Sequence, residues 1–399
     1  MIAREIQSSV YENLENNKIL LLLGARQVGK TTILKDLHNT IEKEGKEVFY
    51  FNLEDPSFLE RFNEHPKNLF EFIGTSKTKK YIFIDEIQLL KDPSNFLKLL
   101  YDEYSDILKI IVTGSSAFYI DKKFNDSLSG RKKIFYIQTL NFREFLTFKG
   151  EIKLREQFRG ATILPYYHKD IQGLYIEYMT YGGYPECVLL NTIQEKKEYL
   201  ASIAQSYIKK DILEARIEHQ EKYFFILKIL ASQVGNLLNT HEIANTINLP
   251  TSTVERYIYI MKKSFHIATI QPFFERNIRK ELTKMPKIYF LDLGLRNYFL
   301  NNFDPFDTRI DKGSLLENAV YKNLISLYDF DGVKYWRTQN KNEVDFIIEA
   351  EKIAYEVKTN IEKFEEKKYS LFKKTYPEYH LLPLDMGRNI EILCESKKH

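Results

Sequence analysis

The chain has 399 residues, and 44% of them are hydrophobic. A chain of this length is too long for one ordinary core, so we expect two to four domains. Its apolar runs are strand-sized and fall well short of the roughly 20 residues of a membrane span, and its first residues lack a signal-peptide pattern. The two cysteines, Cys187 and Cys394, have no metal-ligand spacing and suit a reducing compartment. These features predict a cytoplasmic multidomain protein with no membrane partner, and the net charge of +3 by itself indicates no ligand.

The first motif is a glycine-rich loop between an apolar run and a helical pattern, with the sequence Gly24-Ala-Arg-Gln-Val-Gly-Lys-Thr31. In loops of this spacing, the glycines let backbone N–H groups face phosphates, the lysine reaches the β- and γ-phosphates, and the threonine holds Mg²⁺. The start of the following helix adds its positive end. The sequence therefore predicts a site for ATP with Mg²⁺, whose candidate binding residues are Gly24, Ala25, Arg26, Gln27, Val28, Gly29, Lys30, Thr31 and Thr32.

A second apolar run, over residues 81–84, ends in the two carboxylates Asp85 and Glu86. Asp85 is a candidate to hold Mg²⁺ through water, and Glu86 is placed to polarise a water molecule for attack on the γ-phosphate. Taken alone, the run is a buried strand followed by a solvated acidic turn. Because it follows a phosphate-binding loop, we favour the catalytic interpretation, in which Lys30 and Glu86 are the catalytic residues.

Strand-like runs alternate with helical stretches through the first third of the chain, which predicts a mostly parallel sheet with helices on both faces. The runs cover residues 19–23, 48–53, 81–85, 109–113 and 134–138. The second run lies between the two nucleotide motifs and indicates an inserted strand, as in ATPases whose catalytic Glu follows the Mg²⁺-site Asp.

Three polar residues near the ends of the later strands are candidates to contact the nucleotide. Thr113 and Ser115 follow the fourth strand and could sense the γ-phosphate, although a polar turn explains them equally well. Arg131 precedes the last strand. It is either a charge-stabilising arginine that acts within or between subunits, or an ordinary surface arginine.

The middle of the chain predicts two further regions. Residues 141–235 are helical and rich in Tyr, Phe and Leu, as expected of a helical lid. Residues 239–257 carry a helix, a short turn and a second helix, and two apolar runs at 265–274 and 287–291 fit a two-stranded wing. Residues 250–300 hold nine Lys or Arg against four acids, so the predicted winged helix is a candidate DNA surface that presents Arg256 and Lys263. A module for protein contact is the alternative.

The C-terminal region contains two strand-like runs, at residues 343–348 and 353–358, joined by four residues. A tight turn centred on residues 350–351 places Asp345 opposite Glu356, and Glu343 opposite Lys358. Opposed carboxylates repel each other unless a cation offsets their charge, so Asp345 and Glu356 are candidate ligands of a divalent ion.

Two neighbours of this hairpin complete the predicted site. Lys358 is a candidate to orient a water molecule or to stabilise a phosphate transition state. Glu317, in an apparent helix over residues 315–327, is a candidate third metal ligand. This arrangement resembles the metal-dependent nuclease superfamily of restriction enzymes and Holliday junction resolvases; an amphipathic hairpin with a wet polar face is the alternative.

Nearly the full chain resembles the prokaryotic AAA-type ATPases that carry a C-terminal domain of uncharacterised function related to archaeal Holliday junction resolvases. The resemblance rests on the hairpin and on residues 24–31, 84–88, 113–116, 129–131, 182–185, 286–294 and 316–317. The phosphate-loop signals are highly specific. The Gly182-Gly-Tyr-Pro185 and Pro286-Lys-Ile-Tyr289 segments identify the family without indicating a chemical role.

The resemblance implies an α/β protein with four parts. These are a P-loop ATPase core (1–145), a helical lid (146–235), a winged helix (236–304) and a restriction-endonuclease-like domain of the PD-(D/E)xK type (305–399). The first functional hypothesis is ATP hydrolysis coupled to DNA binding through the winged helix and C-terminal domain, where a second divalent cation, Mg²⁺ or Mn²⁺, would support cutting. The alternative is an ATP/ADP-controlled switch or scaffold for a protein partner, with a silent nuclease fold. Homo-oligomers are compatible with both.

Overall fold

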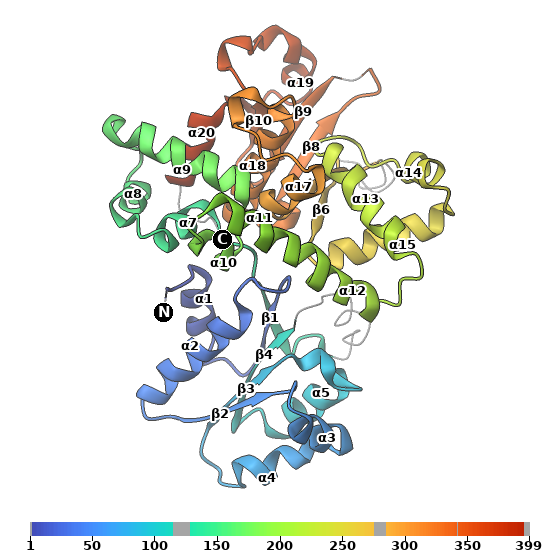
Figure 1. Cartoon of the computed structure of the whole chain (residues 1–399). Coiled ribbons are helices and arrows are strands. Elements are labelled where there is room, and N and C mark those ends of the chain that lie inside the picture. Colours follow the sequence, from blue (N-terminus) through green and yellow to red (C-terminus); the bar gives the residue numbers. More distant parts are fainter. Residues whose placement is uncertain (1, 115–127, 275–284, 341, 395–399) are drawn as a thin grey trace. The chain divides into compact units, whose positions relative to one another are not determined.

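The computed structural model describes residues 2–114, 128–274, 285–340 and 342–394 (Figure 1). Its contacts divide the chain into two compact units. The first runs to Gln138 and includes Lys263–Phe265, and the second contains the remainder. The predicted division into four domains stays a prediction. Within the described ranges, no helix has the length and apolarity needed to cross a membrane.

The first unit is built on a five-stranded parallel sheet with the order β2-β3-β4-β1-β5, which confirms the predicted α/β arrangement. Its strands are β1 (Ile19–Leu23), β2 (Glu47–Asn52), β3 (Lys80–Asp85), β4 (Leu108–Gly114) and β5 (Lys132–Tyr136). Its helices are α1 (Ile6–Glu12), α2 (Lys30–Lys43), α3 (Pro56–Glu64), α4 (Leu69–Ile73) and α5 (Pro93–Tyr104). Strands β1, β3 and β4 are buried at every position, which explains the apolar runs at their centres.

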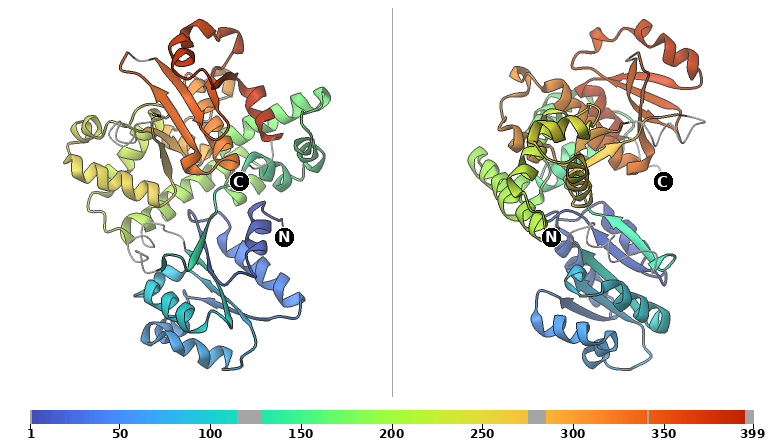
Figure 2. Two further views of the ribbon diagram at one scale, coloured as in Figure 1. Left: turned by 180° about the vertical axis from the view of Figure 1, so that it is seen from behind. Right: turned by 90° about the vertical axis from the view of Figure 1, so that its right-hand side faces the viewer.

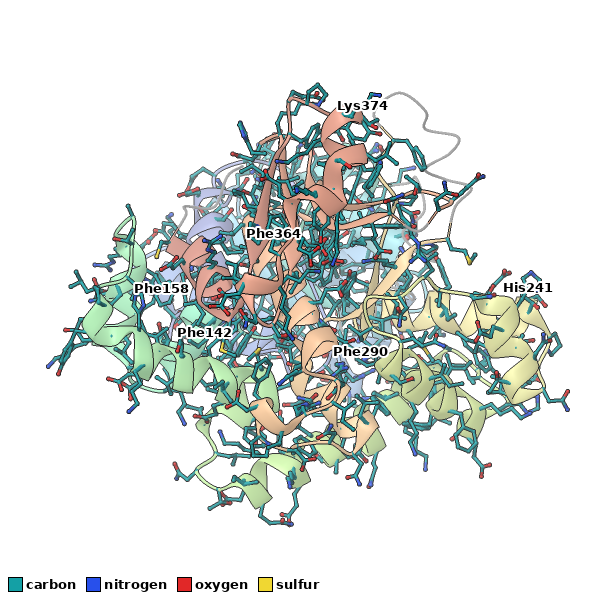
Figure 3. The ribbon with its side chains drawn as sticks, turned by 90° about the horizontal axis from the view of Figure 1, so that it is seen from above. Phe142, Phe158, His241, Phe290, Phe364 and Lys374 are labelled. Carbon is teal, nitrogen blue, oxygen red and sulfur yellow. The ribbon has the colours of Figure 1, made fainter. Side chains whose placement is uncertain are left out.

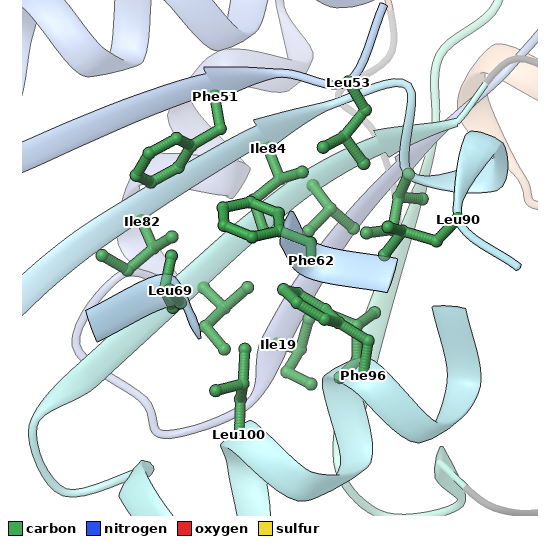
Figure 4. Packing of buried hydrophobic residues seen from close by; sticks show 14 of the residues in the cluster. Ile19, Phe51, Leu53, Phe62, Leu69, Ile82, Ile84, Leu90, Phe96 and Leu100 are labelled. Atoms are coloured by element: carbon green, nitrogen blue, oxygen red, sulfur yellow. The ribbon is translucent and has the colours of Figure 1, made fainter. Parts of the chain in front are cut away.

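The core of this unit lies between the sheet and helices α3, α4 and α5 (Figure 4). Phe62 of α3 and Phe96 of α5 pack with ring centroids 5.3 Å apart, over strand residues such as Ile82 and Ile84. Because β1, β3 and β4 are parallel, their carboxyl ends meet at one edge of the sheet. The phosphate loop, Asp85 and Thr113 are all placed at that edge.

The second unit begins with a helical region and continues into a helix pair and a two-stranded sheet. The first helices are α7 (Phe142–Phe148), α8 (Ile152–Glu156), α9 (His168–Tyr181), α10 (Pro185–Leu189), α11 (Ile193–Ser202), α12 (Lys209–Glu214) and α13 (Gln220–Ser232). There follow α14 (Thr240–Ile247), α15 (Thr251–Lys263) and the antiparallel strands β6 (Ile267–Ile270) and β7 (Lys287–Phe290). Figure 3 shows Phe142 and Phe158 on one side of this unit, His241 on the other, and Phe290 between them.

The C-terminal part of the second unit is a mixed sheet with the order β11-β10-β9-β8 and flanking helices. Its strands are β8 (Val333–Arg337), β9 (Glu343–Ile348), β10 (Ile353–Val357) and β11 (His380–Leu384). Its helices are α17 (Leu293–Leu300), α18 (Lys312–Leu327), α19 (Ser370–Thr375) and α20 (Met386–Glu391). Seen from behind in Figure 2, the strands of this sheet lie in front of α18.

The helical region and the C-terminal part share one core. The Tyr175 hydroxyl of α9 accepts hydrogen bonds from the Asn323 amide of α18 at 3.0 Å and the Asn389 amide of α20 at 2.7 Å. All three residues are fully buried, so each polar atom depends on the others for a partner. Helix α9 therefore belongs to the same packed core as α18 and α20.

Strand β7 is also part of this core, although the sequence predicts it as one strand of a wing. Every residue of β7 is buried. The side-chain amide of Asn318 in α18 donates to the Phe290 carbonyl at 2.8 Å and accepts from the Phe290 N–H at 3.0 Å, so it replaces a neighbouring strand. The Tyr289 ring stacks on Tyr321 with centroids 4.5 Å apart. Strand β7 is therefore not part of a free, solvent-exposed wing.

The Gly182-Gly-Tyr-Pro185 motif contacts residues 292–294, at the end of the segment 286–294 that also carries the family resemblance. The Gly183 N–H donates to Oδ2 of the buried Asp292 at 2.8 Å, while Oδ1 of Asp292 accepts from Leu295 N–H at 2.9 Å and caps α17. A Cβ on Gly294 would lie 2.1 Å from the Tyr181 carbonyl oxygen, so only glycine fits there. These contacts hold the end of α9 against the start of α17.

Candidate functional site

The phosphate loop holds the Lys30 ammonium inside its own turn. Lys30 Nζ donates to the carbonyl oxygens of Ala25 at 2.7 Å and Gly24 at 3.1 Å, and the residue is only 5% exposed. Gly29, at φ +92°, is the N-cap of α2, and Gln27 in the loop also has a positive φ of 62°. The chain thus curls around a buried cation directly before a helix start, as phosphate binding requires.

The other predicted loop residues occupy the turn and the first turn of the helix. Ala25 and Val28 are buried, Arg26 is half-buried, Thr31 is half-buried and Thr32 is exposed. These residues lie in the segment between β1 and α2 or at the start of α2, and their contacts with a nucleotide stay a prediction.

Two contacts of this loop could not be read from its motif. A Cβ on Gly24 would lie 2.0 Å from the Ile137 carbonyl oxygen, so the approach of the chain after β5 requires glycine here independently of any phosphate. The Arg4 guanidinium donates to the carbonyl oxygens of Val28 and Gln138, each at 2.9 Å. Arg4 therefore ties the loop to the segment that follows β5. No sequence signal marks Arg4.

Asp85 is held by two hydroxyl groups at the end of β3. Tyr50 of β2 donates to Oδ2 at 2.9 Å and Thr113 of β4 donates to Oδ1. The Thr113 oxygen also accepts from the Glu86 N–H at 3.0 Å. Burial and the Asp85 charge raise the pKa of Tyr50, which keeps its hydroxyl protonated as a donor. Thr113, predicted as a γ-phosphate sensor, orients the two carboxylate residues in this structure.

Glu86 adopts a backbone conformation that is unfavourable for residues other than glycine. Its φ is 59°, in the left-handed region, which costs about 1–3 kcal/mol and is typical of functional sites. Its carboxylate accepts a hydrogen bond from the Gln88 side chain. The chain therefore turns at Glu86, directly after β3 ends, and does not continue as a strand.

Arg131 lies at the opposite edge of the sheet from the phosphate loop. Its carbonyl accepts from the N–H of Ile19, the first residue of β1, and its guanidinium pairs with Asp102 at 2.6 Å. Because each residue of β1 advances the chain by about 3.3 Å, the loop lies a full strand length away. In this structure Arg131 pairs with Asp102, and its predicted charge-stabilising role, within or between subunits, stays a prediction. Ser115 lies outside the described residues.

The C-terminal hairpin has the predicted register. Tyr355 pairs with Phe346 and Ala354 with Ile347, which sets Glu356 opposite Asp345 at the next position. Tyr355 and Phe346 are the last paired residues of the two strands. Beyond them, the Val357 N–H donates to Oδ2 of Asp345 at 2.9 Å. Lys358 pairs with Oε1 of Glu356 at 2.5 Å.

Glu317 joins the acidic residues of this hairpin, but so does a lysine that the sequence analysis did not place there. Lys287, the first residue of β7, has its Nζ 2.5 Å from Glu343, 3.2 Å from Asp345 and 3.3 Å from Glu317. We call Lys287, Glu317, Glu343 and Asp345 the acidic cluster. Burial disfavours the charged form of Lys287, but the three carboxylates outweigh it and raise the pKa of the ammonium.

Two carboxyl groups in this region bind protons unusually well. Burial raises the pKa of Glu317 to about 7, with the Asp345 charge adding to the shift and Lys287 opposing it. Burial likewise raises the pKa of Glu356 to about 7, again with a contribution from Asp345. Both groups therefore hold protons more tightly in the folded protein than in the unfolded chain.

This difference predicts a loss of stability as the pH rises. Protonated Glu317 and Glu356 contribute stability that is fully present below the ordinary pKa of 4.5 and is lost as the pH passes about 7. The unfolding free energy should therefore decline over this window, and the Glu317→Gln variant should show a shallower decline. Denaturant titrations across the pH series, followed by the fluorescence of Trp336, the one tryptophan, would measure both slopes. Identical slopes would show that Glu317 does not titrate there.

The residues of the acidic cluster do not fit a divalent cation. The ammonium of Lys287 already contacts all three carboxylates, and a Cβ on Gly235 would lie 2.6 Å from Oε2 of Glu317. In the described part of the chain, no group of three or more His, Cys, Asp or Glu side chains is arranged to hold a metal ion. The contacts of Lys287 do not support the predicted metal role of Glu317 and Asp345, while Glu356 lies outside the acidic cluster and pairs with Lys358.

The basic residues of the predicted DNA surface are not all exposed in the structure. Lys287 and Arg296 are fully buried; Arg296 pairs with Asp311 at 2.7 Å. Arg256 of α15 is exposed, donates to the Ala215 carbonyl at 3.1 Å and lies one helical turn from the 45% exposed Tyr259. A charge count over a sequence window cannot distinguish these two groups. Arg276, Arg279, Lys280 and Lys284 lie outside the described residues.

Three family models match separate parts of the chain. Residues 16–146 match the family model of an AAA domain, and residues 172–305 and 312–392 match two different domains of unknown function. The AAA domain match supports an AAA-type ATPase, a fold that suggests nucleotide binding and hydrolysis.

Two relatives carry names that describe them as uncharacterized proteins. One protein of Methanocaldococcus jannaschii is 28% identical over 376 residues, which are 90% of this chain and 80% of that protein. One protein of Haemophilus influenzae is 26% identical over 369 residues, which are 89% of this chain and 86% of that protein. Among solved structures, the RuvB Holliday junction branch migration motor of Thermotoga maritima matches 71% of this chain and 95% of that chain, at 12% identity and a TM-score of 0.34.

Proposed function

We propose that this chain is a Mg²⁺-dependent AAA-type ATPase that hydrolyses ATP at the carboxyl edge of the first sheet. The observation that carries the proposal is the meeting of Lys30, Asp85 and Glu86 at this edge, with Asp85 fixed by the hydroxyls of Tyr50 and Thr113. Lys30 would bind the phosphates. Thr31 and Asp85 would hold Mg²⁺, which neutralises phosphate charge when bound. Glu86 would take the proton of the attacking water.

Replacing Lys30 by alanine is expected to abolish ATP binding, because the variant loses the buried cation inside the phosphate loop. Equilibrium binding of ATP to the full-length protein measures the effect. Lys43→Ala is the matched control, since it removes an exposed lysine from the last turn of the same helix. Equal ATP affinities of the wild type and Lys30→Ala would contradict a nucleotide site at this loop.

We further propose that the nucleotide state acts as a switch that sets how the second unit binds a partner. This is favoured over metal-dependent DNA cutting because Lys287 contacts two of the three predicted metal ligands, Glu317 and Asp345. ATP hydrolysis alone does not separate the two hypotheses. Degradation of linear, branched or single-stranded DNA by the purified protein with Mg²⁺ or Mn²⁺ would restore the nuclease hypothesis.

DNA is the candidate partner that a specific feature favours. Helices α14 and α15 are joined by a turn in which Asn248 is left-handed, and α15 presents Arg256 and Tyr259 to solvent. A helix pair of this kind can place its second helix in the major groove. A winged helix that binds duplex DNA is therefore part of the proposal, with its second strand buried rather than exposed.

The double variant Arg256→Ala/Lys263→Ala is expected to weaken duplex binding and to make it less sensitive to salt. Each lost phosphate contact should reduce the slope of log affinity against log salt by about 0.9. Fluorescence anisotropy over a salt series measures both quantities. Lys367→Ala/Lys368→Ala removes the same charge from an exposed segment elsewhere and serves as the control. If the first double variant keeps the affinity and slope of the wild type, a protein partner becomes the better hypothesis.

A further inference from the structure

The Lys287 ammonium has its full set of partners in the acidic cluster. An ammonium group has three donors, and Nζ of Lys287 lies within 3.3 Å of oxygens from three carboxylates, those of Glu317, Glu343 and Asp345. Glu317 comes from α18, while the other two come from β9. Glu343 also pairs with Arg337 at 2.7 Å. The negative charges that the hairpin brings together are therefore offset by cations of the same chain.

The backbone of Lys287 is fixed on two sides. Lys287 pairs with Ile270 of β6 on one side and forms a bridge with Leu237 on the other. The preceding Pro286 carbonyl accepts from the Leu238 N–H at 2.8 Å. The start of the Lys287 side chain is therefore held at a fixed place beside the cluster.

The ammonium is buried and has aromatic neighbours, whereas the side chains of Glu317, Glu343 and Asp345 are 17%, 24% and 14% exposed. The Tyr335 ring centroid is 5.7 Å from Nζ, and the Tyr289 hydroxyl donates to Oε1 of Glu317 at 2.7 Å. Gly235, at φ +80°, presses against the Glu317 carboxylate so closely that a methyl group would not fit. A divalent ion could enter only by displacing a buried, paired ammonium, which is costly.

We propose that Lys287 is a built-in cation that takes the place of a divalent metal in the acidic cluster and keeps this nuclease-like centre silent. The same contact joins β7 to α18 and β9, so the centre serves as a structural ion network in the second unit. The residues of the acidic cluster are remote in sequence from the phosphate loop. The role of Lys287 therefore does not depend on whether the chain hydrolyses ATP.

The test is the melting temperature of the full-length protein in MnCl₂ without nucleotide, compared with a metal-free sample. We expect no Mn²⁺-dependent rise for the wild type. Lys287→Ala should lower the melting temperature in metal-free buffer, and Mn²⁺ should then raise it by several degrees, because an ion bound to the folded state stabilises it. The rise should disappear in Lys287→Ala/Asp345→Asn. Lys334→Ala, which removes a partly exposed partner of Glu349, is the control and should gain no Mn²⁺ effect.

Two outcomes would overturn the proposal. One is a Mn²⁺-dependent rise in the wild type that Asp345→Asn abolishes, because it would show that a metal binds despite Lys287. The other is a folded Lys287→Ala protein that gains no Mn²⁺ effect, because the ammonium would then not occupy a cation site. If Lys287→Ala does not fold, Lys287→Met takes its place, and a folded Lys287→Met protein that gains no Mn²⁺ effect overturns the proposal in the same way.

Discussion

Replacing Glu86 by glutamine is expected to slow ATP hydrolysis by about 10²- to 10⁴-fold while leaving ATP binding unchanged. Glutamine keeps the size and hydrogen-bonding capacity of the side chain but cannot accept the proton of the attacking water. The phosphate loop is unaltered, so Lys30 should still hold the nucleotide. Phosphate release and equilibrium binding, measured on the same preparation, separate the two effects.

Glu103→Gln provides the control for this substitution. Glu103 is an exposed carboxylate of α5 that pairs with Lys67 at 2.6 Å, and its replacement should leave turnover unchanged. Turnover at the wild-type rate in Glu86→Gln would remove Glu86 from the catalytic role. A loss of binding in Glu86→Gln would show instead that the strained turn at φ 59° shapes the nucleotide site.

Replacing Lys287 by methionine is expected to lower the unfolding free energy of the second unit by about 3–5 kcal/mol, because removal of one partner leaves buried charges uncompensated. Methionine fills a similar volume, so the effect reports charge rather than an empty space. Denaturant unfolding followed by the fluorescence of Trp336, which lies in β8 beside β9, measures the change.

Lys334→Met is the matched control for this experiment. Lys334 forms an ion pair with Glu349 in which the two side chains are 23% and 48% exposed, so its removal should cost no more than about 1 kcal/mol. Equal losses from the two substitutions would contradict the account of Lys287 as a buried counter-ion. A smaller loss in Lys287→Met/Glu343→Gln than in Lys287→Met would support it, since one unpaired charge is removed.

The local structure of the candidate nucleotide site was largely predictable because its information is local. The loop between β1 and α2 has a fixed spacing, and the apolar run before Asp85 needs only a buried strand to place its carboxylate at the sheet edge. The hairpin register was predictable for a similar reason. A short turn and strict alternation allow one pairing, and the observed Tyr355–Phe346 pair agrees with it.

Contacts between distant segments could not be predicted in this way. Tyr50 reaches Asp85 from a neighbouring strand, and Arg4 reaches Val28 from the N-terminal segment. Lys287 is one of the nine basic residues in the window 250–300 from which a contact surface is predicted. In the structure it is buried against acidic residues that lie 30 to 58 positions further along the chain. Sequence periodicity reports which residues are buried along one element, but not which element covers them.

The central claim is that the edge of the first sheet hydrolyses ATP, and phosphate release by the full-length wild type tests it most directly. The account predicts release that requires Mg²⁺, stops when EDTA is added and is absent in Lys30→Ala. A wild-type protein that binds ATP with Mg²⁺ but releases no phosphate above the Lys30→Ala background would contradict it.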